Sequence, residues 1–219
     1  MQKISLKIPY AILKENHRQV RDQQTENAKI RIHRALSWLK NIDSLNEPDL
    51  IFIHLWISFN AAYADDFHET KSERACLKNF LNQIVELDRN KHIHNALFTK
   101  FSGPIRNLID NKFAFEPFWK AMREHDSSDK WKEWFNQHKS DAIKVMTGGN
   151  TSALLSIILD RIYTLRNQLI HGGSTYDSSI NRQQINDACQ IMADLVPMIL
   201  DIMIKNHDND FGEIAYPVV

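Results

Sequence analysis

The chain has 219 residues, equal numbers of basic (Lys and Arg) and acidic (Asp and Glu) residues, and only six glycines and six prolines. This length allows one large domain or two small ones with a substantial apolar core. So few glycines and prolines disfavour a loop-rich all-β fold and favour long helices. No apolar run approaches the roughly 20 residues of a membrane span, and a net charge of zero gives no bulk attraction to nucleic acid.

The sequence also bears on the compartment. Its first residues, "MQKISLKIPY", lack the basic-then-apolar pattern of a secretory signal. Cys76 and Cys189 each stand alone in a helical pattern, which is typical of reduced core residues in a cytosolic protein. His92 and His94 have no carboxylate or thiolate at a supporting spacing, so we predict no metal site. We expect a cytoplasmic protein without a cofactor.

Charge is distributed unevenly along the chain. Residues 1–40 hold nine Lys and Arg against three Asp and Glu, whereas residues 186–219 hold one against six. Such asymmetry suggests a basic arm over residues 1–25 and an acidic tail over residues 207–219, or charge-complementary contact between protomers. Chance clustering on a solvated surface explains the same numbers equally well.

Residues 1–25 read as irregular, with "KISLKI" alternating like a short strand or extended arm. Helical periodicity begins at Glu26. The helix over residues 49–67 is apolar nearly all round, which places it at the centre of the domain. We predict an all-α bundle over residues 26–206, with 90–147 as a helical insertion. The long helices are expected over residues 26–42, 49–67, 71–88, 128–146, 151–171 and 182–206.

The motif "RNQLIHGG", residues 166–173, ends the otherwise apolar helix "SALLSIILDRIYTL". At about 100° per residue, Arg166 falls in line with Ile162 on the apolar stripe. An unpaired guanidinium is costly there, so we expect Arg166 to have an anionic partner or to face a cleft. A structural arginine paired with a carboxylate remains the alternative.

Asn167 and His171 are four residues apart and share a helix face, and Gly172 suits the left-handed conformation that ends a helix. An arginine and a histidine grouped in this way suit phosphodiester chemistry without a metal. The histidine can take a proton from a ribose 2′-hydroxyl or give one to the leaving oxygen. The arginine can stabilise charge on the phosphate oxygens.

The spacing alone is not distinctive, because "RNKHIH" repeats it with Arg89 and His94. That copy follows Asp88 in a polar stretch, so we interpret it as a solvated connector. Asn60 is a possible wall of the site, although a core stripe in which Asn60 bonds a neighbouring helix is the alternative. Lys3, Lys7, Lys14, Arg18 and Arg21 could hold an RNA backbone, which the neutral total charge neither supports nor excludes.

The stretch "YTLRNQLIHGGS", continuing into "NRQQINDACQIMADLVPMIL", resembles the end of a HEPN domain. "DLIFIHLWISFNAAYADD" also resembles the early core helix of the Apea-like HEPN relatives. The resemblance covers roughly residues 26–67 and 150–205. It implies a helical fold and, in many members, a metal-independent endoribonuclease with a composite site across a homodimer. The catalytic pair would be Arg166 and His171, with Asn167 as a substrate contact.

The resemblance also implies a biological setting. Such ribonucleases occur among toxins of toxin–antitoxin and anti-phage defence systems, so RNA, a second copy of the chain and an antitoxin are the expected partners. Other HEPN members are not catalytic. They dimerise and bind a nucleotide or a protein, such as a partner nucleotidyltransferase. The non-catalytic module is therefore the alternative function.

Overall fold

The computed structural model of the chain describes residues 3–63 and 73–214. These residues form helices and connecting segments without a strand, which confirms the all-α prediction. The chain divides into two compact units, unit 1 (Met1–Ile93 and Cys189–Val219) and unit 2 (His94–Ala188). Each unit is described by itself below.

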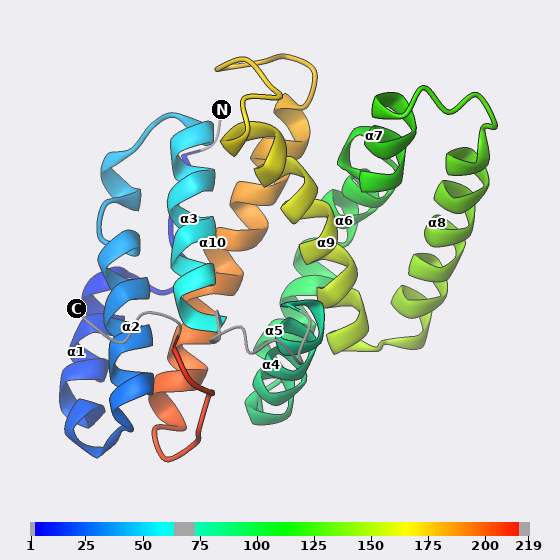
Figure 1. Ribbon diagram of the computed structural model, residues 1–219. Helices are drawn as coiled ribbons and strands as arrows, with labels where there is room; N and C mark the ends of the chain where they lie inside the picture. The colour runs from blue at the N-terminus through cyan, green and yellow to red at the C-terminus, as the bar shows by residue number, and fades with distance from the viewer. Residues whose placement is uncertain (1–2, 64–72, 215–219) are drawn as a thin grey trace. The chain divides into compact units, whose positions relative to one another are not determined.

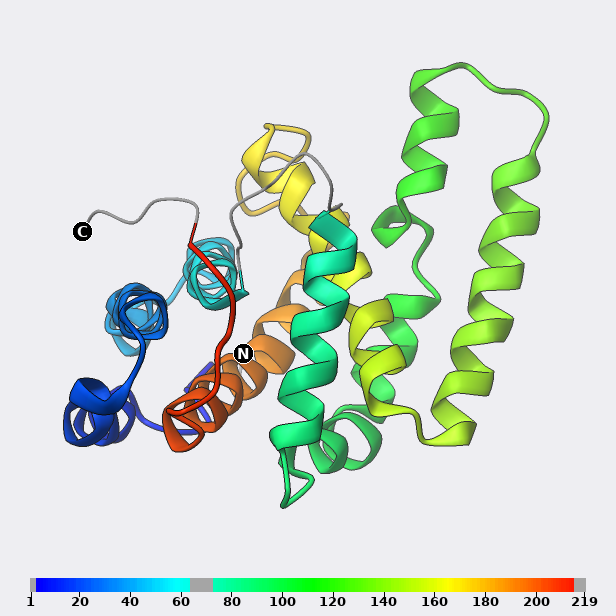
Figure 2. The same ribbon diagram turned by 60° about the horizontal axis from the view of Figure 1, so that its bottom comes forward.

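The helices follow one another in chain order (Figures 1 and 2). The first half of the chain contains α1 (Tyr10–Val20), η1 (Arg21–Gln23), α2 (Glu26–Leu39), η2 (Ile42–Ser44), α3 (Pro48–Tyr63), α4 (Glu73–Leu87) and α5 (His92–Asn95). The second half contains η3 (Ala96–Lys100), α6 (Ser102–Ile109), η4 (Lys112–Ala114), α7 (Glu116–Arg123), α8 (Lys130–Gly148), α9 (Thr151–Ile170) and α10 (Arg182–Lys205).

The predicted long helices correspond to α2, α3, α4, α8, α9 and α10, with ends displaced by no more than one helical turn where both ends are described. Two predicted ends lie outside the described residues: the C-terminal end of the helix over 49–67 and the N-terminal end of the helix over 71–88. These are the segments in which apolar residues recur with helical period over several turns. Strong periodicity is the most reliable signal that a sequence gives of a helix.

The interpretation of residues 1–25 as irregular is wrong in part, because Tyr10–Val20 forms α1. Pro9 precedes its first residue, and only Leu13 and His17 of this helix are buried, so most of α1 lies outside the core. The "KISLKI" segment belongs to no helix or strand, and the chain bends at its end. Ile4 and Leu6 are buried, and the Lys7 amide donates to the Ala193 carbonyl over 3.0 Å.

Unit 1 is built around the packing of α2 on α3. In Figure 2, α1, α2 and α3 are seen nearly end-on as a row of neighbouring helices. The apolar face of α2 is buried, and so are most residues of α3. One face of α3 is not: Leu50 is 42% exposed, and Ile53, His54 and Ile57 beside it are only half-buried, so the prediction of a helix buried nearly all round is correct in part. The Ser58 hydroxyl donates to the Ala35 carbonyl over 2.9 Å, so the packing of α2 on α3 includes a polar link between the helices.

The segment predicted as an acidic tail over residues 207–219 is assigned to unit 1, and the structure describes it as far as residue 214. Within its described part, Phe211 and Ile214 are buried, and the Phe211 ring lies 6.5 Å from that of Phe80. The fully buried Arg31 of α2 donates to the carbonyls of Ala62 and Glu213. Two apolar side chains and a buried arginine therefore anchor a segment whose composition suggested a solvated tail.

Unit 2 contains the antiparallel pair α7 and α8, and α8 packs in turn on α9 (Figure 2). The core face of α9 includes Leu155, Ile158 and Ile162, all fully buried. The segment predicted as an insertion thus supplies the helices that cover α9. Among the described residues of the whole chain, no helix is both long enough and apolar enough to cross a membrane.

His17 of α1 is buried, and its Nε2 shares a 2.9 Å hydrogen bond with Gln24 Oε1. Burial lowers the pKa of His17, and the charges of His33, Arg21 and Lys29 lower it further, against the hydrogen bond to Gln24, which raises it. The imidazole is thus held neutral in the folded protein at pH values where the unfolded chain is already protonated.

We expect the free energy of unfolding to fall as the pH decreases through about 6.5, the ordinary pKa of histidine, because the unfolded state takes up the His17 proton first. The loss ends below the folded-state pKa. Urea unfolding at pH 7.5, 6.5, 5.5 and 5.0 measures it. His17→Gln should show a shallower loss than the wild type, and equal slopes for the two proteins would contradict the assignment.

Candidate functional site

The candidate site lies at the C-terminal end of α9, in unit 2. The helix starts after Asn150, whose side chain caps it by accepting from the Ala153 amide over 3.1 Å. It ends at His171, whose amide still donates to the Asn167 carbonyl over 3.0 Å. Gly172 follows with φ +67°, the left-handed conformation expected of it. The Gly172 amide donates to the Leu169 carbonyl over 3.3 Å and completes the helix end.

Arg166 is half-buried and has no carboxylate partner among the described residues. Its Nη1 donates to Asn167 Oδ1 over 2.9 Å, and its guanidinium carbon lies 5.9 Å from the centre of the Tyr163 ring. Its Nε is buried without a hydrogen-bond partner in the described part of the chain. An arginine that serves structure alone is normally satisfied by acceptors. The buried Nε itself is out of reach of a ligand, but the side chain is half-buried and its one hydrogen bond goes to the adjacent Asn167, so the rest of the guanidinium can meet an external acceptor.

The buried arginine of α9 is Arg161, which the sequence analysis did not single out. It is 5% exposed, its Nη1 donates to the Ala114 carbonyl over 3.3 Å, and its guanidinium lies 4.5 Å from the centre of the Phe115 ring. Burial lowers the pKa of Arg161 to about 10, although the charges of Asp160 and Asp110 raise it. The prediction that Arg166 lies on the buried stripe is thus corrected: Arg166 lies at its margin, and Arg161 is enclosed.

One face of α9 carries Tyr163, Arg166, Asn167 and Ile170, at the spacing i, i+3, i+4, i+7. Tyr163 is 39% exposed and Ile170 45% exposed, and His171 beyond them is exposed as well. The His171 side chain makes no hydrogen bond or ion pair with the described residues. The structure therefore joins Arg166 to Asn167 directly and leaves the imidazole of His171 accessible at the helix end.

The loop after the motif is fixed to α9 by Gln168. Gln168 Nε2 donates to the Phe113 carbonyl over 2.6 Å, and Gln168 Oε1 accepts from Asn181 Nδ2 over 2.7 Å. Asn181 is buried, whereas Tyr176 and Ile180 of the same loop are among the most exposed apolar side chains of the described residues. Sequence reasoning missed Gln168 because an amide inside a polar motif gives no sign of what it binds.

Asn60 lies in unit 1, on α3, where Trp56 and Tyr63 beside it are buried core residues. Its half-buried side chain forms no hydrogen bond with the described residues, so the alternative in which it bonds a neighbouring helix finds no support there. Its role as a wall of the site stays a prediction, because Arg166 and His171 belong to the other unit.

The second copy of the spacing has a structural explanation. Both carboxylate oxygens of Asp88 accept backbone amides, from His92 over 3.0 Å and from Ile93 over 2.7 Å, and so cap α5. His94 Nδ1 shares a 2.8 Å hydrogen bond with Thr151 Oγ1, and its ring stacks on Phe98. Arg89 is exposed. In residues 3–63 and 73–214, no three His, Cys, Asp or Glu side chains are grouped to hold a metal ion.

Comparisons with known proteins find no match to this chain among family models, curated proteins or solved structures. Any assignment of function therefore depends on the residues and on their geometry.

The two glycines after α9 should respond differently to substitution. A Cβ at Gly172 meets no atom within 4 Å, but its φ of +67° is strained for any L side chain. Gly173 lacks a positive φ, and a Cβ there would make ordinary contact with Gln168. Gly172→Ala should lower the free energy of unfolding by about 1–2 kcal/mol, and Gly173→Ala by less than about 0.5 kcal/mol, in urea titrations. Equal effects would contradict the left-handed helix end.

The two arginines of α9 should likewise separate in stability. Arg161→Ala removes a buried side chain that satisfies a carbonyl and packs on two aromatic rings, so we expect a loss of about 2–4 kcal/mol. Arg166→Ala removes a half-buried side chain bonded only to its neighbour and should cost less than about 1 kcal/mol. Thermal and urea unfolding measure both, and a larger loss at Arg166 would show that Arg166 is a structural residue.

Proposed function

We propose that this protein is a metal-independent endoribonuclease of HEPN type that acts as a homodimer. The observation that carries the proposal is the state of Arg166. Its side chain is half-buried, has no carboxylate partner among the described residues and hydrogen-bonds only the adjacent Asn167, five residues before an exposed histidine. A phosphate is the acceptor that matches a planar, permanently charged group with several donors.

The chemistry follows from these side chains. His171 of one protomer removes the proton from a ribose 2′-hydroxyl, whose oxygen attacks the adjacent phosphorus. The bond from phosphorus to the 5′-oxygen breaks, and the leaving oxygen takes a proton from the second copy of His171. Arg166 stabilises the charge that grows on the non-bridging oxygens, and Asn167 holds the guanidinium or a further phosphate oxygen. The products are a 2′,3′-cyclic phosphate and a 5′-hydroxyl.

The homodimer is part of the proposal, because one motif supplies a single histidine and the reaction needs an acid and a base. The exposed apolar side chains of Tyr163 and Ile170 flank Arg166 and Asn167 on the same helix face. Apolar residues exposed beside a polar group are typical of a surface that meets a partner. A two-fold axis at this face would bring both copies of the motif into one cleft.

The resemblance to HEPN ribonucleases of toxin–antitoxin and anti-phage systems is the basis for a further part of the proposal. On that basis we propose that the protein is a defence toxin with a cognate antitoxin.

One observation favours the non-catalytic module instead. The imidazole of His171 has no hydrogen-bonding partner among the described residues, whereas a catalytic histidine is commonly oriented by a second group. In that module Arg166 and His171 would hold an anionic ligand, such as a nucleotide, without cleaving it.

Incubation of the purified protein with total RNA and tRNA in the presence of EDTA tests the proposal. The wild type should release fragments that end in a 2′,3′-cyclic phosphate. His171→Ala should lower the rate about 100-fold or more, and Arg166→Ala by a similar factor, because a general acid or base contributes about 10²–10⁴ and a charge-stabilising donor about 10²–10³.

Arg89→Ala is the matched control, since it changes the arginine in the other copy of the spacing and should leave the rate unchanged. Sedimentation velocity on the same samples reports whether the protein is a dimer. Intact RNA at every pH tested, or full activity of His171→Ala, would exclude the ribonuclease and leave the binding module.

A further inference from the structure

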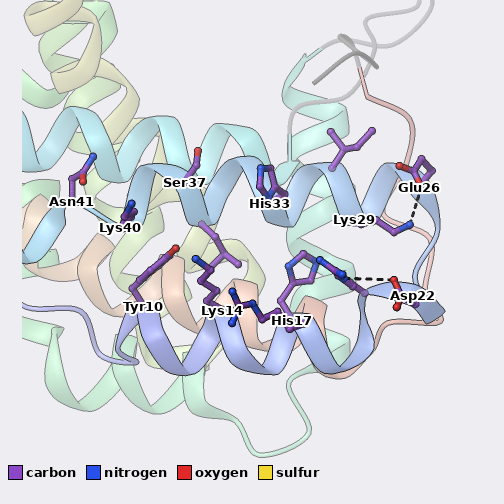
Figure 3. Close-up of a pocket in the computed structure, with 14 residues that line it drawn as sticks. Tyr10, Lys14, His17, Asp22, Glu26, Lys29, His33, Ser37, Lys40 and Asn41 are labelled. Atoms are coloured by element: carbon purple, nitrogen blue, oxygen red, sulfur yellow. Dashed lines mark hydrogen bonds and ion pairs between the residues drawn. The ribbon is translucent and has the colours of Figure 1, made fainter.

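A groove of about 800 Å³ lies between α1 and α2 of unit 1 (Figure 3). Its lining residues are distant along the chain from Arg166 and His171. In Figure 3, Tyr10, Lys14 and His17 project from α1 toward α2, and His33 and Lys40 lie on α2 on the other side of the groove. All of the lining residues come from one compact unit, so the groove is formed within unit 1 alone.

The groove is strongly basic although the whole chain is neutral. Five lining residues are Lys or Arg and two are His, against one Asp and one Glu. The basic set is Lys14, Arg18, Arg21, Lys29 and Lys40, with His17 and His33. The acids are Asp22 and Glu26, which pair with Arg21 over 3.5 Å and with Lys29 over 3.0 Å. Exposed pairs of this kind are weak and leave the positive potential largely in place.

Two of the cations have no acidic partner in the described part of the chain. Lys40 makes no ion pair or hydrogen bond there, and Lys14 only lies over the Tyr10 ring, with its Nζ 5.5 Å from the ring centre. Arg18 pairs with Glu15 over 3.6 Å, and both side chains are more than half exposed. A ligand can therefore take up these cations without breaking a buried interaction.

The cations form two rows rather than a single cluster. Lys14 and Arg18 on α1 and Arg21 just beyond its end follow one another at i, i+4 and i+7. Lys29 on α2 and Lys40 just after its end form the second row, with His33 between them. At about 1.5 Å per residue, the rows are about 10 Å and 16 Å long. Rows of this length exceed the reach of one phosphate group and match a chain of successive phosphates. Neighbouring helices pack about 8–10 Å apart, which leaves a furrow too narrow for a duplex.

An aromatic ring and an imidazole ring also line the groove, between the basic side chains. Tyr10 is half-buried at one end, and the buried His17 lies at its base. Burial and the surrounding positive charges lower the pKa of His17, so this ring is present as a neutral surface between the cations. Positive grooves with interspersed rings are the usual means of binding single-stranded nucleic acid without sequence readout.

We propose that the groove between α1 and α2 binds the phosphate backbone of single-stranded RNA. The proposal rests on the proposed ribonuclease function, which supplies the class of polyanion, and gives the protein a second contact with RNA besides Arg166 and His171. It adds cations of α2, namely Lys29 and Lys40, to those that the sequence grouped along the N-terminal segment.

Binding of a fluorescent 12-nucleotide single-stranded RNA to the His171→Ala protein, followed by anisotropy between 50 and 300 mM salt, tests the proposal without cleavage. The variant Lys14→Ala/Arg18→Ala/Lys40→Ala should bind at least about tenfold more weakly at 150 mM salt. Its slope of log affinity against log salt should be smaller by about 2, at about 0.7 per lost phosphate contact.

The matched control is Lys78→Ala/Arg89→Ala/Lys91→Ala, which removes the same charge from exposed positions of unit 1 outside the groove. It should bind within about twofold of the parent. Thermal melting of both triple variants checks that each folds. Equal weakening of the two, no binding by the parent, or binding of anionic lipid vesicles in place of RNA would overturn the proposal.

Failure of the groove and failure of the ribonuclease give different results. If the wild type does not cleave RNA but binding depends on the groove residues, the groove proposal stands and the ribonuclease is excluded. If the wild type cleaves RNA and the groove variant binds the 12-nucleotide RNA as tightly as the control, the ribonuclease stands and the groove proposal is overturned.

Discussion

The cost of removing a guanidinium from water constrains both units of this protein. A buried arginine must find acceptors for its donors, and a backbone carbonyl at the end of a helix or in an irregular segment supplies one without adding a second charge. Arg31 meets this need in unit 1 through Ala62 and Glu213, and Arg161 meets it in unit 2 through Ala114 and two aromatic rings. Each arginine therefore joins segments that are distant in the sequence.

The same need for acceptors distinguishes Arg166 from Arg161. It lies one turn and a half beyond Arg161 on the same helix, yet the only acceptor that it finds among the described residues is the amide of the adjacent Asn167. Two arginines on one helix thus have different environments: the first is enclosed and donates to a distant backbone carbonyl, and the second is half-buried and donates only to its neighbour. This contrast, rather than the spacing of arginine and histidine, distinguishes the motif from its copy at Arg89.

The long helices could be predicted from the sequence because their apolar residues repeat with helical period over several turns. α1 was missed because it is short and buries only Leu13 and His17, so it has few apolar residues from which a helix can be recognised. Arg161 was missed for a related reason: periodicity shows which residues share a face, but not which of two arginines becomes enclosed. The acceptor at Ala114 lies 47 residues earlier, and only the folded chain brings the two together.

The basic groove is a second case in which the sequence does not show which residues become neighbours in the folded chain. The sequence grouped Lys14, Arg18 and Arg21 as neighbours along the chain, but their partners Lys29 and Lys40 belong to the next helix and become neighbours only when α1 packs on α2. Net charge gave no hint of this, because a total of zero is compatible with a local excess on one surface. Local charge in a folded protein depends on packing and on composition together.

Unit 1 is assembled from two stretches of chain, and this has a consequence for its formation during synthesis. Residues 94–188 form one continuous unit, so every residue of that unit has been synthesised before unit 1 is complete. Unit 1 includes most of α10, and Arg31 lacks one of its acceptors until Glu213 has been added. The N-terminal helices α2 and α3 can contact each other early in synthesis, but unit 1 obtains its last contacts only from the final part of the chain that the structure describes.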